Sequence, residues 1–123
     1  MTSIAPWLTV RDASASIEFY RAAFGASVTE SLDDGAGTVF VAGLSVDGAP
    51  LWLSADPDFT GQVDGGGAAR MILTVADPDA VFAAALAAGA TEIGAVAEEH
   101  GWRIGRIADP DGHHWEVGRR LDE

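Results

Sequence analysis

The feature that most constrains the fold of this chain is an internal repeat. Leu8–Asp12 (Leu-Thr-Val-x-Asp) recurs 65 residues later as Leu73–Asp77, and Gly25-Ala26 recurs after 64 residues as Gly89-Ala90. Around each copy the pattern indicates a strand, a capping aspartate, a helix, a glycine and then further strands. Because these signals return in the same order, chance is a poor explanation even in a chain rich in Ala and Gly. The sequence therefore predicts two copies of one β-α-β-β-β unit.

The first copy is predicted to occupy residues 3–54. Asp12 is a good N-cap for a helix, and Gly25 is a suitable C′ residue to end it. Asp47-Gly48 is the strongest hairpin signal in the chain, because both residues accept a positive φ. The predicted elements are a strand over 3–10, a helix over 13–24, and strands over 26–32, 38–46 and 49–54.

The second copy is predicted to occupy residues 69–119. Asp77 caps its helix, with Pro78 at the first helical position, where the missing N–H costs nothing. A short strand over 91–96 precedes two strands joined by the turn Asp109–Gly112. Residues 55–68 show no periodicity and read as a linker, and their glycines lack the phosphate-loop spacing.

These patterns predict the fold class. It is an α+β fold built from a duplicated β-α-β-β-β module, with a cupped mixed sheet and the helices on the outside. The chain has 123 residues, which suits a single domain.

Composition narrows the possible partners and compartments. The formal net charge of −12 argues against nucleic acid as a partner, because phosphates would be repelled. It permits attraction to a cationic small molecule, although a soluble acidic surface is the simpler explanation of the charge. There is no cysteine, no apolar run of about 20 residues and no secretory signal, so we expect a cytoplasmic protein that does not enter the membrane.

Two stretches of the chain resemble the motifs of a known superfamily. The first consists of Val10–Asp12, Ser16–Arg21 and Phe24–Ala26, and the second of Gly101–Arg103 and Asp109–Glu116. With the doubled unit, they resemble the vicinal oxygen chelate superfamily of glyoxalase I, bleomycin-resistance proteins, extradiol dioxygenases and fosfomycin-resistance enzymes. The resemblance covers essentially the whole chain. It is closest to the metal-free bleomycin-resistance-like and glyoxalase-like members.

The resemblance also implies where a metal would bind. Enzymes of the superfamily hold a divalent ion through side chains on the first and last strands of each module, and these positions correspond to Ala5, Trp52, Arg70 and Glu116. Only Glu116 can be a ligand, because Arg stays protonated and has no acceptor. A catalytic site normally takes three protein ligands. The resemblance therefore implies a member with no metal and no cofactor.

Glu116 and its neighbours allow three readings. His114 and Glu116 share one face of a strand, so either could act as a general base, with Arg70 or Arg106 stabilising an anion. Alternatively, Arg70 and Glu116 form a structural ion pair where a metal would otherwise sit. A third reading is a metal set of Glu116 and His114, completed by His100.

The remaining candidate residues would line a cleft. If the sheet cups around a cavity as in the superfamily, strand alternation predicts an aromatic-walled pocket, the usual make-up of a small-molecule site. Its tryptophans favour planar ligands by stacking, although each could instead be a core or dimer-interface residue. The predicted ligand-binding residues are Trp7, Thr9, Trp52, Ile72, Trp102, Ile104 and Arg106.

We therefore predict a metal-independent small-molecule-binding protein, of the drug-sequestering bleomycin-resistance type. Its ligand would be small and either aromatic or cationic. The resemblance further implies a homodimer. A glyoxalase-like lyase or isomerase that uses Glu116 or His114 as its base is the alternative, and a metal-dependent enzyme is the third possibility.

Overall fold

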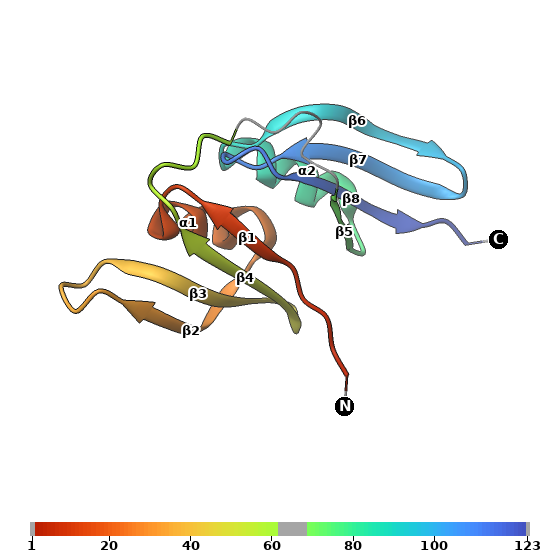
Figure 1. The fold of residues 1–123 in the computed structure, drawn as a ribbon. Coiled ribbons are helices and arrows are strands. Elements are labelled where there is room, and N and C mark those ends of the chain that lie inside the picture. The colour runs from red at the N-terminus through yellow and green to blue at the C-terminus, as the bar shows by residue number, and fades with distance from the viewer. Residues whose placement is uncertain (1, 62–68, 123) are drawn as a thin grey trace. The chain divides into compact units, whose positions relative to one another are not determined.

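Each repeat folds into its own four-stranded sheet with one helix packed against it (Figure 1). The structure is a computed structural model that describes residues 2–61 and 69–122. The chain divides into two compact units, Met1–Gly61 and Gln62–Glu123, which we call the first and second modules. The duplicated α+β architecture expected from the sequence is confirmed. Gly65–Gly67 of the predicted linker lie outside the described residues.

The first module has the predicted element order. Its sheet runs β1-β4-β3-β2, with β1 parallel to β4 and the other neighbours antiparallel. Helix α1 packs on β3 and β4 and buries Phe19, Tyr20 and Phe24. The elements are β1 (Trp7–Val10), α1 (Ala13–Phe24), β2 (Ser27–Asp33), β3 (Val39–Val46) and β4 (Ala49–Ala55).

Local signals explain where these elements begin and end. The Asp12 side chain accepts a hydrogen bond from the backbone N–H of Ala15, and Gly25 ends the helix with φ 71°. Asp47 and Gly48 both have positive φ, 51° and 90°, which matches the twist of the hairpin that they close. Both predicted caps and the predicted hairpin are confirmed.

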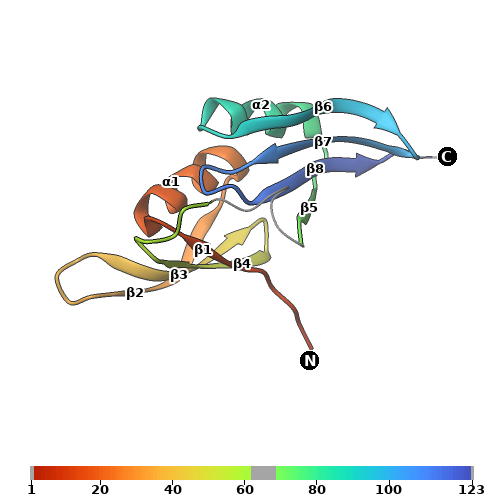
Figure 2. The ribbon, with the colours of Figure 1, turned by 45° about the horizontal axis from the view of Figure 1, so that its top comes forward.

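The second module repeats this plan (Figure 2). Its sheet runs β5-β8-β7-β6, and α2 packs on β6, β7 and β8. The Asp77 side chain caps α2 by accepting from the backbone N–H of Ala80. The elements are β5 (Met71–Thr74), α2 (Pro78–Ala87), β6 (Thr91–Glu99), β7 (Trp102–Ala108) and β8 (His114–Arg120).

The two modules agree in register as well as in order. In the first module Trp7 lies opposite Trp52 across the parallel β1–β4 pair. In the second, Ile72 lies opposite Glu116 across β5–β8. These are the partners expected from the repeat offsets of 65 and 64 residues in the sequence. Equivalent positions in the two modules can therefore be compared directly.

Three element boundaries differ clearly from the prediction. Strand β6 continues past Val96 to Glu99, because Glu98 and Glu99 pair with Arg103 and Trp102 on β7. The sequence did not predict this extension, because residues 97–99 are all exposed and show no alternation of buried and exposed positions. The first strand of the first module was predicted over 3–10 but pairs with β4 only from Trp7. The first strand of the second module was predicted over 69–75 but pairs with β8 only from Met71.

No helix among the described residues is long and apolar enough to cross a membrane.

Candidate functional site

The turn that precedes β8 fixes the position of the candidate site. The buried Asp109 carboxylate accepts hydrogen bonds from the backbone N–H groups of Asp111 and His113, at 3.0 and 2.9 Å. Gly112 adopts φ 93°, as the turn requires, and the Asp109 N–H donates to the His113 carbonyl at 2.8 Å. Because this turn starts β8 at His114, alternation directs His114 and Glu116 to one face of the sheet.

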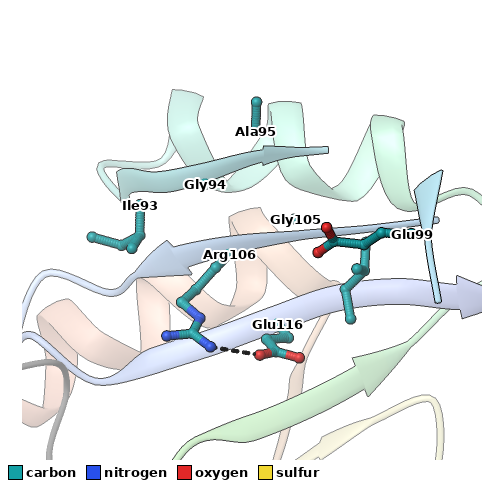
Figure 3. Close-up of a pocket in the computed structure, with 8 residues that line it drawn as sticks. Ile93, Gly94, Ala95, Glu99, Gly105, Arg106 and Glu116 are labelled. Atoms are coloured by element: carbon teal, nitrogen blue, oxygen red, sulfur yellow. Dashed lines mark hydrogen bonds and ion pairs between the residues drawn. The ribbon is translucent and has the colours of Figure 1, made fainter. Parts of the chain in front are cut away.

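The charged hydrogen bonds on that face converge on the Glu116 carboxylate. Its Oε1 atom accepts a hydrogen bond from Arg106 Nη2 at 2.7 Å and another from Arg70 Nε at 2.6 Å. Arg106 lies directly opposite Glu116 on β7, and Arg70 immediately precedes β5 (Figure 3 shows the Arg106 contact). The predicted pair of Arg70 and Glu116 is confirmed. The second guanidinium, from Arg106, was not anticipated as a partner.

These contacts set the charge state of Glu116. Its side chain is only 16% exposed, and burial alone would raise the pKa of the carboxyl group. The hydrogen bonds from Arg106 and Arg70 outweigh burial, so the pKa of Glu116 is lowered. Glu116 is therefore held as an ionised, doubly paired carboxylate.

His114 is buried beside the same charges. Burial lowers its pKa, and the positive charges of Arg106 and Arg70 lower it further against the opposing effect of Asp109. Among the described residues, its Nδ1 atom has no hydrogen-bond partner. Near neutral pH these effects favour the neutral imidazole, and one of its ring nitrogens has no hydrogen-bond partner among the described residues.

A groove runs along this face of the second module. One hollow of about 290 Å³ is lined by Ile93, Gly94, Ala95, Glu99, Ile104, Gly105, Arg106 and Glu116 (Figure 3). A second hollow of about 240 Å³ shares Glu99, Ile104 and Glu116 with it. That second hollow adds Ile72, His100 and Trp102. Four predicted ligand-binding residues, Ile72, Trp102, Ile104 and Arg106, are therefore gathered around Glu116.

The sequence reasoning missed five residues that line the first hollow, namely Ile93, Gly94, Ala95, Glu99 and Gly105. Ile93 and Glu99 both lie on β6. Glu99 falls in the part of β6 that was not predicted as strand, so no alternation argument reached it. Glu99 reaches into the groove from the end of that strand (Figure 3).

The first module carries an aromatic site instead. The Trp7 and Trp52 rings stack nearly parallel, with centroids 5.6 Å apart and an interplanar angle of 9°. The Trp7 indole N–H donates to Ser54 Oγ at 2.9 Å, yet the residue remains 57% exposed. Trp52 also lines a hollow of about 340 Å³ with Glu30, Ser31, Leu32 and Val41. Thr9 follows on the same face of β1 as Trp7, opposite Ser54.

The side chains present do not fit a metal ion. Ala5 lies ahead of β1, and Trp52 and Arg70 offer no ligand atoms. Glu116 already accepts from two guanidinium groups at Oε1, and their positive charges would repel a cation at this carboxylate. Within residues 2–61 and 69–122, no group of three or more His, Asp or Glu side chains gathers closely enough to hold a metal ion.

Known proteins share both the sequence pattern and the fold. Residues 7–118 match the profile of the family described as "Glyoxalase-like domain". An uncharacterised protein of Mycobacterium bovis is 36% identical, and the match covers 98% of this chain and 85% of that protein. An uncharacterised protein of Mycobacterium tuberculosis is also 36% identical, over 98% of this chain and 76% of its own length.

Solved structures extend the likeness at the level of the fold. TioX from Micromonospora sp. ML1 matches with a TM-score of 0.77 and 24% identity, over 98% of this chain and 100% of that one. A glyoxalase/bleomycin resistance protein/dioxygenase family enzyme from Burkholderia phytofirmans PsJN has a TM-score of 0.74 and 20% identity, covering 95% and 97%. The fosfomycin resistance protein FosX from Listeria monocytogenes has a TM-score of 0.73 and 15% identity, covering 97% and 93%. The chain therefore belongs to the glyoxalase-like domain family, within the vicinal oxygen chelate superfamily.

Proposed function

We propose that this protein binds a small aromatic molecule without a metal, and that it acts by sequestering that molecule, as a drug-resistance protein does. The observation that carries the proposal is the stacked pair Trp7–Trp52 on the first module. Trp7 is 57% exposed and lies against a second indole, so the pair leaves aromatic surface open to a planar ligand.

The indole pair suits a planar ligand. Offset stacking of aromatic rings contributes about 0.5–1.5 kcal/mol beyond the burial of area. The hydrogen bond from Trp7 to Ser54 holds the ring in one orientation, which reduces the entropy lost on binding. Leu32 and Val41 beside Trp52 offer further apolar contact. The acidic net charge of −12 supports a ligand that also carries positive charge.

The second module gives less support to base catalysis. A general base works best with a pKa near the working pH. The pKa of Glu116 is lowered by its two arginines, and that of His114 is lowered by burial and the same charges. Both groups are therefore weak bases near neutral pH. Binding is the function that this geometry favours over a lyase or isomerase reaction.

Calorimetric titration with bleomycin and other planar cationic compounds, with and without a chelator, tests the proposal. We expect saturable binding that the chelator does not change. Trp7→Ala should weaken it by about tenfold, the equivalent of one lost stacking contact. Phe40→Ala is the matched control, because Phe40 is an exposed aromatic residue of β3 that strand alternation places on the opposite face of the sheet from Val41 and Trp52.

The proposal is contradicted if no compound gives saturable heat, or if the chelator abolishes binding. Equal losses of affinity in Trp7→Ala and Phe40→Ala would also contradict it.

A homodimer and a cytoplasmic location remain predictions from the sequence. Sedimentation velocity at several protein concentrations checks the homodimer.

A further inference from the structure

We infer that the groove on the second module is a binding site for a small carboxylate with an apolar body. The inference concerns Arg106, Arg70 and the walls around them. It goes beyond the aromatic site proposed on the first module, and it does not depend on that proposal.

The first argument comes from the hydrogen-bond donors. A guanidinium group has five N–H donors in a planar fork that matches a carboxylate. Among the residues that the structure describes, Arg106 and Arg70 each donate one N–H, and both donate to Glu116 Oε1. Donors therefore remain on both arginines. Arg106 lines the groove and is 32% exposed, so a ligand can reach it there, and Arg70, 52% exposed, contacts the same Glu116 oxygen without lining either hollow.

The second argument comes from charge. Two guanidinium groups around one carboxylate leave a single net positive charge at this point of the sheet. One carboxylate on a ligand balances it. Glu99 lines the same groove and offsets that charge over the groove as a whole, so a doubly charged phosphate meets stronger repulsion there than a carboxylate does. The balance favours a monoanion.

The third argument comes from the walls of the groove. Ile93, Ala95 and Ile104 line the same hollow as Arg106 and supply apolar surface next to its positive charge. Ile93 is 47% exposed and has surface left to cover. Glu116 holds Arg106 in one orientation, so the guanidinium is positioned before a ligand arrives (Figure 3). A molecule with one anionic end and one apolar end complements this surface.

The test compares probes that share one ring and differ in charge. The intact chain is titrated with benzoate, benzyl alcohol, benzylamine and inorganic phosphate, at pH 7 and low salt, and backbone amide shifts of the second module are followed by NMR. We expect saturable shifts around Arg106 with benzoate. Benzyl alcohol should bind at least about tenfold more weakly, because it cannot form the charge-assisted bonds.

Variants assign the effect to the arginines. Arg106→Gln should weaken benzoate binding by about tenfold or more, and Arg70→Gln by a smaller factor, because Arg70 is more exposed. Arg21→Gln is the matched control: it removes one arginine from the exposed Glu18 pair on α1 and should change nothing. If Arg106→Gln impairs folding, the Arg70→Gln variant and the comparison of benzoate with the other probes still test whether the groove binds a carboxylate.

Four outcomes would overturn the inference. They are no saturable benzoate binding, equal binding of benzoate and benzyl alcohol, tighter binding of benzylamine, and tighter Arg106-dependent binding of phosphate. Benzoate binding can fail while bleomycin binds, and the reverse, so this inference and the proposed function fail separately.

Discussion

The two modules have one backbone plan and opposite chemistry at equivalent positions. Where the first module has Trp52, the second has Glu116. The residue opposite Trp52 on β3 is Gly43, and the residue opposite Glu116 on β7 is Arg106. A Cβ added at Gly43 would lie 3.0 Å from the Trp52 ring, so the indole occupies space that a side chain would need. The scaffold thus tolerates either an aromatic stack or a charged cluster.

A second equivalent pair shows the same division. Ser54 in the first module accepts the hydrogen bond of the Trp7 indole. Its counterpart, Gly118, has no side chain, and a Cβ there would lie 2.8 Å from both the Arg103 carbonyl oxygen and Ile104 Cγ1. A few residues on one face of each sheet therefore decide the chemistry of that module, while the register of the strands is the same in both modules.

The largest expected effect tests whether the charged cluster also stabilises the second module. Glu116→Gln should lower the free energy of unfolding by about 2 kcal/mol, because two guanidinium groups lose their charged acceptor and Arg70 is too exposed to add its full share. Urea denaturation at pH 7 measures this. Glu98→Gln, which removes an exposed partner 3.6 Å from Arg103, is the control and should cost under about 0.5 kcal/mol. If both variants lowered the free energy of unfolding equally, the charged cluster would contribute no more to stability than an exposed ion pair.

A smaller effect is expected when the second module is made to resemble the first. Gly118→Ser should destabilise the protein by about 1–2 kcal/mol, because the new Cβ meets the backbone of β7 and the structure must shift. Thermal unfolding followed by circular dichroism measures it. Gly94→Ser on β6 adds the same side chain where nothing lies within 4 Å, and it should leave stability nearly unchanged. A neutral Gly118→Ser would show that the modules are interchangeable at this position.

The smallest effect concerns pH. The pKa of His114 is lower in the folded state than its ordinary value of 6.5, chiefly because of burial, so the unfolded chain binds more protons below that pH. The resulting stability is present above pH 6.5 and is lost as the pH falls toward the folded pKa. We expect the melting temperature to fall between pH 7 and pH 5, and His114→Gln to flatten that fall. An unchanged slope in His114→Gln would contradict the assignment.

Much of the fold could be predicted, because its signals are local. Each signal involves only residues that are close in the sequence: the helix caps at Asp12 and Asp77, and the hairpin turn at Asp47-Gly48. The end of β6 could not be predicted, because only pairing with β7 makes a strand of its polar residues. At the candidate site, the contact of Arg70 with Glu116 was one of the alternatives that the superfamily resemblance implied, and the structure shows it. The contact of Arg106 required the register of β7 on β8, which depends on the turn at Asp109.

By itself, the sequence determined the duplicated α+β plan and the face on which Glu116, His114 and Arg106 stand, since strand alternation and repeat offsets are properties of the chain. Only the tertiary structure decided which charges meet. Glu116 has two arginine partners because neighbouring strands bring residues 10 and 46 positions apart within hydrogen-bonding distance. The same carboxylate with no arginine nearby would have a raised pKa and a different chemistry.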